Sequence, residues 1–126
     1  MTTLWIGLGG ALGSMARHWL AVLVQERTGV GFPYGTLTVN VLGSFFAAVL
    51  MHVAFTTEAV PPTLRVGLMT GVLGGFTTYS AFNYETLRLA QSGALGSALL
   101  NVVATVLGCL VAGICGWALA RAFVGA

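Results

Sequence analysis

The sequence predicts an all-α integral membrane protein with four transmembrane helices, the third of them broken at mid-membrane. Of the 126 residues, 57% are hydrophobic and 6% are charged, and lysine does not occur, whereas soluble domains carry about 25% charged residues. Four apolar stretches are each long enough to cross a hydrocarbon core about 30 Å thick. Short loops separate them, so we expect a single domain, residues 1–126, with both termini on one side of the bilayer.

The first span is expected at about residues 4–24. Four glycines, which have no side chains, make one side of this helix thin and so permit close contact with another helix. Arg17 lies inside this apolar stretch, where a charge is costly unless it snorkels to the interface, pairs, or faces water. No basic run precedes the span, so a cleaved signal peptide is not expected. The glycines are Gly7, Gly9, Gly10 and Gly13.

The second span, about residues 34–55, carries a polar stripe. Thr36, Asn40 and Ser44 recur every four residues and therefore share one helix face. Buried polar groups need hydrogen-bond partners, so this face should meet another polar surface or water. The alternative is that these groups only hold helices together by hydrogen bonds.

The third span, about residues 63–89, is long for one crossing and contains residues that disfavour a continuous helix. Two adjacent glycines each cost about 1 kcal/mol of helix propensity relative to alanine, and the hydroxyl residues after them begin a helix better than they continue one. We expect the first helix to end near Leu73, a break over about 74–78, and a new start near Tyr79. The residues concerned are Gly74, Gly75, Thr77, Thr78 and Ser80.

A helix break inside a membrane is tolerated only where the freed backbone groups face a cavity or other protein groups. The first half-helix ends in unpaired carbonyls, which suit a cation, and the second begins with unpaired N–H groups, which suit an anion. The break therefore indicates an ion site. A glycine-rich packing kink without a ligand is the alternative.

The fourth span is expected at about residues 95–120, and it carries a second polar stripe with a ridge of small residues beside it. Such a ridge favours close helix contact. Cys109 and Cys115 are six positions apart on one helix, point to different faces, and are not expected to form a disulfide. The stripe consists of Ser97, Asn101, Thr105 and Cys109, and the ridge of Gly108, Ala112 and Gly116.

The arginines that flank the spans are balanced between the two sides of the membrane. Arg65 and Arg121 lie on the side of the termini, and Arg27 and Arg88 on the other. The positive-inside rule then selects no orientation. Two oppositely inserted copies would form an antiparallel homodimer, which supplies the inverted repeat that many transporters carry within one chain. A chance balance of so few charges is the alternative.

The polar groups near the break are mostly hydrogen-bond donors, which favours an anion path, because carboxylates would dominate a cation path. Tyr79 and Phe82 are three residues apart on one face of the restarted helix, and the positive edges of aromatic rings can line such a path. Plain packing is the alternative for this pair. The polar residues are Thr36, Asn40, Ser44, Ser80, Thr105 and the Tyr79 hydroxyl.

Three stretches of the chain, residues 9–17, 35–40 and 71–85, resemble the small bacterial fluoride channels of the Fluc/CrcB family. They read Gly-Gly-Ala-Leu-Gly-Ser-Met-Ala-Arg, Gly-Thr-Leu-Thr-Val-Asn, and a broken-helix motif that begins Gly-Val-Leu-Gly-Gly-Phe-Thr-Thr-Tyr-Ser. The resemblance covers essentially the whole chain. It implies a fluoride-selective channel in the bacterial cytoplasmic (inner) membrane, not an enzyme, which exports fluoride passively and protects against fluoride toxicity. It further implies a dual-topology, antiparallel homodimer with two pores.

The resemblance also implies roles for individual residues. A central, structural sodium ion (Na⁺) would be held by the backbone carbonyls of Gly74 and Thr77 from each copy. Asn40 corresponds to the pore asparagine, and Tyr79 and Phe82 to a stacked aromatic pair. The sequence departs from the family pattern at Tyr79, Ala81 and Cys109, where phenylalanine, threonine and serine are usual. The polar-track positions are Thr36, Ser80, Glu85, Thr105 and Cys109, with Arg17 as the first-helix arginine.

Other function classes fit less well. A small multidrug exporter can also be a four-span, dual-topology dimer, but proton coupling there needs a carboxylate inside the first span, where this chain has Arg17 and no acid. A non-conducting assembly protein would explain the small-residue ridge but not the two polar stripes. No nucleophile, base or metal cluster is spaced for catalysis, and five scattered arginines make no nucleic-acid surface. The expected partners are the fluoride ion, the lipid bilayer and a second copy of the chain.

Overall fold

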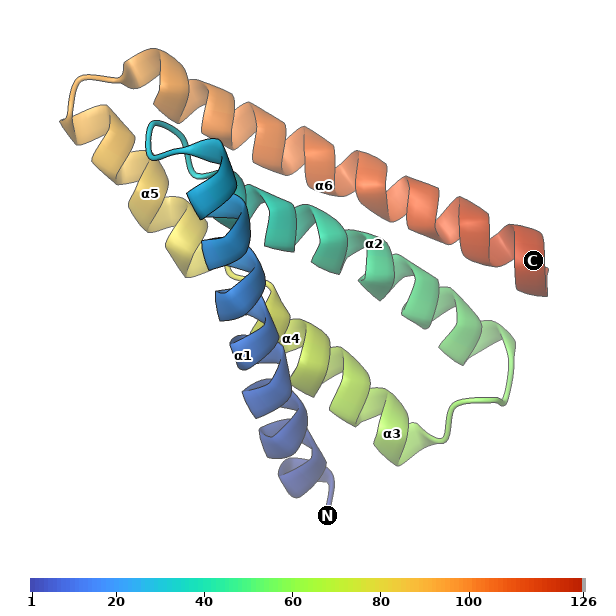
Figure 1. Ribbon diagram of the computed structural model, residues 1–126. Coiled ribbons are helices and arrows are strands. Elements are labelled where there is room, and N and C mark those ends of the chain that lie inside the picture. The colour runs from blue at the N-terminus through green and yellow to red at the C-terminus, as the bar shows by residue number, and fades with distance from the viewer. Residues whose placement is uncertain (126) are drawn as a thin grey trace.

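The computed structural model describes residues 1–125, and this part of the chain is helical without any strand (Figure 1). The all-α class is thus confirmed. Three helices are long and continuous, whereas the third predicted span consists of several consecutive pieces. The elements are α1 (Thr2–Thr28), α2 (Tyr34–Thr56), α3 (Pro62–Val66), the π-helix η1 (Gly67–Leu73), α4 (Gly74–Phe76), α5 (Tyr79–Gln91) and α6 (Leu95–Val124).

The helices form two layers that meet at the break between α4 and α5. In one layer α2 and α6 lie side by side; in the other, α1 packs against η1 and α4, and α5 continues beyond the break to contact α6 (Figure 1). The 29–33 and 92–94 loops lie at one end of the bundle, and both chain ends lie toward the other. There the ring Nε2 of His52 lies 2.6 Å from the carbonyl oxygen of Gly125, which ties the end of α6 to α2.

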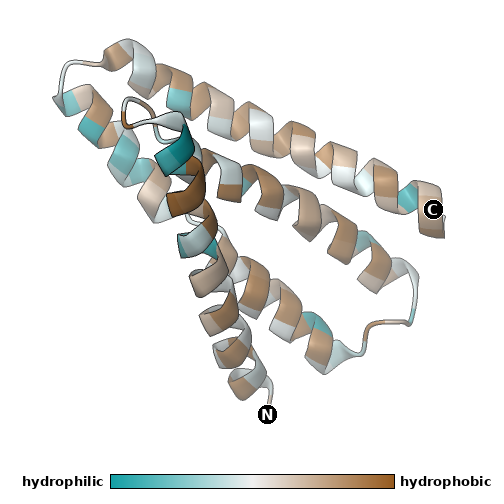
Figure 2. Ribbon diagram, viewed as in Figure 1, coloured by the Kyte–Doolittle hydropathy of each residue, from teal (hydrophilic) through white to brown (hydrophobic). Residues whose placement is uncertain are grey.

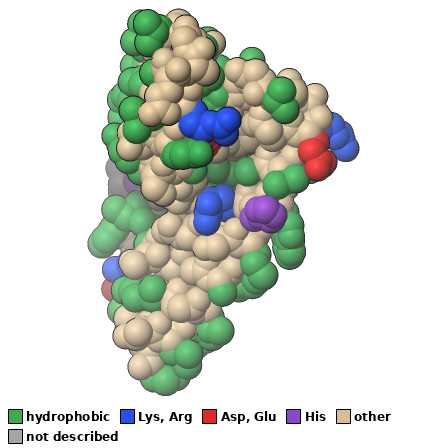
Figure 3. Space-filling view, turned by 90° about the vertical axis from the view of Figure 1, so that its left-hand side faces the viewer, with side chains coloured by type: hydrophobic (Ala, Val, Ile, Leu, Met, Phe, Trp, Pro, Cys, Tyr) green, Lys and Arg blue, Asp and Glu red, His purple; other side chains and the backbone are tan. Residues whose placement is uncertain are grey.

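The surface is apolar in a way that suits a lipid solvent. By length and composition, α2 and α6 are long and apolar enough to cross a membrane, and Figure 2 shows hydrophobic residues distributed around these helices. Large apolar side chains on α6, such as Leu99, Leu107 and Ile114, are exposed. On the face drawn in Figure 3, charged side chains are few and scattered. That all four segments cross the membrane stays a prediction.

Glycines bring α1 into contact with η1 and α4. A Cβ added to Gly9 would lie 2.6 Å from the carbonyl oxygen of Gly67, and one added to Gly13 would overlap the carbonyl oxygen of Val72. Of the four glycines on the predicted thin side, Gly9 and Gly13 therefore pack tightly against the third segment, whereas a Cβ on Gly7 would meet nothing within 4 Å. Close approach of this kind between small residues is what favours helix association in membranes.

The third segment is broken over fewer residues than the sequence suggested. Helix continues through Gly74 and Gly75 to Phe76, and only Thr77 and Thr78 are extended, with ψ angles of 154° and 112°. The predicted end near Leu73 was therefore wrong by three residues, whereas the restart at Tyr79 is confirmed.

Contact with α1 explains why the two glycines remain helical. A Cβ on Gly75 would lie 2.6 Å from the carbonyl oxygen of Gly10, so this glycine serves close packing. Just before it, the π-helix η1 has the wide i→i+5 turn that is often found near functional sites. Nothing in the side-chain pattern of Gly67–Leu73 had predicted that turn.

Candidate functional site

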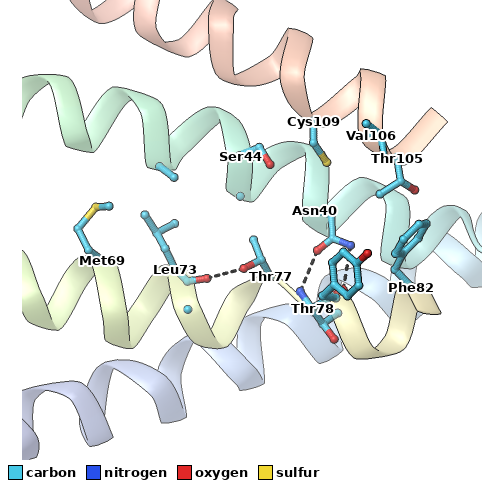
Figure 4. A pocket seen from close by; sticks show the side chains of 14 residues that line it. Asn40, Ser44, Met69, Leu73, Thr77, Thr78, Phe82, Thr105, Val106 and Cys109 are labelled. Carbon is cyan, nitrogen blue, oxygen red and sulfur yellow. Dashed lines mark hydrogen bonds between the residues drawn. The ribbon is translucent and has the colours of Figure 1, made fainter. Parts of the chain in front are cut away.

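Asn40 holds Thr78, the second extended residue of the break, with two hydrogen bonds. Its Nδ2 donates to the carbonyl oxygen of Thr78 at 3.1 Å, and its Oδ1 accepts from the backbone N–H of Thr78 at 2.8 Å (Figure 4). Asn40 lies on α2 and is 7% exposed. Both polar backbone groups of an extended residue are thereby paired in an apolar setting, as buried peptide groups require.

This arrangement leaves the backbone carbonyls of residues 74–77 without the N–H partners that a continuous helix would give them. In a continuous helix, the N–H groups of Thr78 and Ala81 would bond the carbonyls of Gly74 and Thr77. Instead, the Thr78 N–H goes to Asn40, and the Ala81 N–H goes to the Thr78 hydroxyl at 3.2 Å. The carbonyls of Gly74 and Thr77 are thus two of the four that the break releases, and the other two belong to Gly75 and Phe76.

Neighbouring carbonyls are occupied by donors from the protein itself. The Leu73 carbonyl accepts from the N–H and the hydroxyl of Thr77, at 3.1 and 3.0 Å. The Gly75 carbonyl accepts from Nε of Arg17 at 3.0 Å. Arg17 was expected to snorkel to the interface, to pair, or to face water, and the structure shows that it pairs. Its partner is the backbone carbonyl of Gly75, next to the break.

A cavity of about 460 Å³ lies between α2, the break and α6 (Figure 4). The two predicted polar stripes meet here, since Asn40 and Ser44 line it from α2, and Thr105 and Cys109 line it from α6. The break contributes a further group of lining residues. These are Gly74, Thr77, Thr78, Tyr79 and Phe82.

The aromatic pair stands at this cavity in an edge-to-face arrangement. The ring centroids of Tyr79 and Phe82 are 5.4 Å apart, and the ring planes meet at 72°. Phe82 is buried, whereas Tyr79 is 80% exposed. A ring edge carries partial positive charge, so such a pair can turn an edge toward an anion.

Four of the predicted pathway residues lie elsewhere. The Thr36 hydroxyl donates to Oε1 of Glu85 at 2.5 Å, and Glu85 borders a second hollow of about 700 Å³ by the 29–33 loop and the end of α5. The Ser80 hydroxyl lies 3.3 Å from the Thr78 hydroxyl, beside the break. Arg17 contacts the break from α1. The structure therefore brings five of the nine predicted pathway residues into one cavity: Asn40, Tyr79, Phe82, Thr105 and Cys109.

Sequence reasoning missed the role of Gln25. Its Oε1 accepts from the N–H of Gly35 at 3.0 Å, while its Nε2 donates to the carbonyls of Phe32, at 2.9 Å, and Gly29. These bonds fix the loop that leads into α2, directly before Thr36. The signal available in the sequence was a long amide side chain in the last turn of a helix, followed by a glycine-rich loop.

Comparison with known proteins gives one family match. Residues 4–117 match the family model described as "CrcB-like protein, Camphor Resistance (CrcB)". A relative from Sorangium cellulosum, named fluoride-specific ion channel FluC, is 51% identical over 120 residues, which is 95% of this chain and 94% of the relative. Relatives with the same name from Anaeromyxobacter sp. (strain K) and Geobacter metallireducens are 52% and 49% identical, covering 94% and 93% of this chain and 94% and 92% of theirs. These names describe ion channels, not enzymes.

Proposed function

The chain belongs to the CrcB-like family, and from this we propose that it is a fluoride-selective ion channel, which lets fluoride leave the cell passively and so protects the cell against fluoride toxicity. The observation that carries the proposal is the identity of about half of all residues, over more than 90% of both chains, to relatives named fluoride-specific ion channels. We further propose that the membrane is the bacterial cytoplasmic (inner) membrane.

The chemistry of the cavity supports transport of an anion. The described residues that line the cavity carry hydroxyl, amide and thiol groups, and none of them carries a carboxylate. Asn40 uses one Nδ2 hydrogen on Thr78, which leaves the second as a donor. A dehydrating anion needs such donors to replace its water. Tyr79 and Phe82 can add ring edges.

We propose that two copies, inserted in opposite orientations, form an antiparallel homodimer with two fluoride pores. The balanced arginines support dual topology. The exposure of Tyr79, at the rim of an open cavity, supports a second copy that covers this face. An inverted pair would also supply the symmetry on which many transporters rely.

We also propose that a structural sodium ion sits between the two copies. The donor set fits a hard cation, because the Gly74 and Thr77 carbonyls are among those released at the break and oxygen is the ligand that such cations prefer. When bound, the ion would place a positive charge beside the partly negative oxygens of these carbonyls. Asn40 and the Thr78 hydroxyl keep the carbonyls available by engaging the N–H groups that would otherwise bond them.

The function is tested by ion efflux from liposomes. Purified protein, reconstituted into vesicles loaded with fluoride or with chloride, is expected to release fluoride rapidly and chloride at the rate of protein-free vesicles. Ion-selective electrodes measure both anions. Equal release of the two anions would contradict selectivity, and release no faster than from protein-free vesicles would contradict a channel.

The assembly is tested by an experimental density map at high resolution. We expect two antiparallel chains whose breaks face one another. Between them we expect one ion at about 2.3–2.6 Å from carbonyl oxygens, the spacing typical of calcium, a hard cation of similar size. The Gly74 and Thr77 carbonyls should be the ligands. Parallel chains, or a water-like peak with longer contacts, would overturn this part of the proposal.

A further inference from the structure

Three hydrogen bonds form a relay from α6 to α5 beside the cavity, and we propose that its central residue, Asn101, positions the Thr105 hydroxyl and competes with fluoride for the hydrogen of that hydroxyl. This inference rests on the proposed function, because it assumes that fluoride passes the cavity that Thr105 lines.

The direction of the relay is fixed at its α5 end. The Thr86 hydroxyl lies 2.8 Å from the carbonyl oxygen of Phe82. A carbonyl only accepts, so the single hydrogen of the hydroxyl is used there. Towards Asn101, at 2.8 Å, Thr86 can therefore act only as an acceptor, and the group that faces it is the amide Nδ2 of Asn101.

The orientation of the Asn101 amide then decides whether the Thr105 hydroxyl donates or accepts the hydrogen bond between them. With Nδ2 turned to Thr86, Oδ1 faces the Thr105 hydroxyl at 3.5 Å. Oδ1 has no hydrogen, so Thr105 donates. Asn101 is 2% exposed and Thr105 is 9% exposed. Buried groups of this kind rely on each other for hydrogen bonds, and the relay satisfies both.

The relay turns the Thr105 hydrogen away from the cavity. Thr105 lines the cavity, but its hydrogen points at Asn101, and its lone pairs remain for the cavity side. An anion at Thr105 must take that hydrogen from Asn101. The 3.5 Å separation marks a weak bond, which costs little to break. Asn101 thus weakens fluoride binding at this point, and weak binding lets an ion leave toward the next position.

Removing the Asn101 amide should strengthen fluoride binding, provided that Thr105 is present. Asn101→Leu keeps a similar volume without an acceptor, so we expect the fluoride concentration that gives half-maximal efflux to fall about two- to tenfold, the range of one net hydrogen bond. In the Thr105→Val background the same change should produce no shift. Efflux from liposomes over a range of fluoride concentrations measures this, with size-exclusion profiles and melting curves of each variant.

Controls separate positioning from a structural role. Thr38→Val removes a hydroxyl that bonds only the Tyr34 carbonyl of its own helix, and should leave half-maximal efflux unchanged. If Asn101→Leu does not fold, Asn101→Ala removes the amide without bulk and carries the same expectation. An unchanged half-maximal concentration in a folded variant, or an equal shift without the Thr105 hydroxyl, overturns the inference and leaves the channel function intact. Absence of fluoride efflux from the unaltered protein would instead overturn the function.

Discussion

Asn40→Asp is expected to reduce fluoride efflux by roughly a hundred- to a thousandfold in protein that still folds. The amide donates one hydrogen to Thr78 and presents the other to the cavity. An ionised carboxylate has no donor and repels an anion. At about 4 Å and an effective dielectric constant of about 20, like charges oppose each other by about 4 kcal/mol, and each 1.4 kcal/mol is about tenfold in rate.

Efflux at matched amounts of reconstituted protein measures this effect, and Gln91→Glu, also a change from amide to carboxylate, is the control. Gln91 is exposed at the end of α5 beside the 92–94 loop and does not line the cavity, so the change there should leave efflux within about twofold of the unaltered protein. Size-exclusion profiles report whether the protein still folds and assembles, which needs checking because the carboxylate also repels the Thr78 carbonyl that Asn40 binds. Undiminished efflux from well-folded Asn40→Asp protein would remove Asn40 from the fluoride path.

Local rules predicted where a helix begins when the chain itself supplies a start signal. The third span was expected from about residue 63, and α3 begins at Pro62, since proline suits the first helical position. The Thr78 side chain begins α5, as a threonine cap should. The break was misplaced because a propensity scale treats Gly74 and Gly75 as weak helix formers, whereas the fold needs a missing Cβ at Gly75 to admit α1.

The sequence predicted several of the residues that line the cavity, but not the hydrogen bonds between helices that hold the break in place. Spacing along single helices placed Asn40, Thr105, Tyr79 and Phe82 on faces that do meet at the cavity. The hydrogen bonds that fix the break join residues 38 and 58 positions apart, from Asn40 to Thr78 and from Arg17 to Gly75. Periodicity within a helix carries no information on such contacts, because they depend on how the helices cross.

Gly13→Ala is expected to prevent α1 from packing on the third segment and to lower the yield of folded protein at least tenfold. The added Cβ would overlap the carbonyl oxygen of Val72 and lie 3.0 Å from the backbone nitrogen of Phe76. These are backbone atoms on both sides, so no rotamer change relieves the overlap and the helices must separate. Overpacking usually costs about 1–3 kcal/mol, and rigid backbone contacts lie at the upper end. Arg17, one turn along α1, would then also lose its bond to Gly75.

Two further glycines of the same helix make this a graded test. A Cβ on Gly7 would meet nothing within 4 Å, and one on Gly10 would lie 4.0 Å from the Gly71 carbonyl, an ordinary contact. Gly7→Ala should therefore be neutral or slightly stabilising, since alanine gains up to about 1 kcal/mol of helix propensity over glycine. Gly10→Ala should be close to neutral, and Gly13→Ala alone severe. Size-exclusion profiles and melting temperatures in detergent measure the order, and equal losses at all three positions would mean that helix flexibility, not contact with η1, explains the glycines of α1.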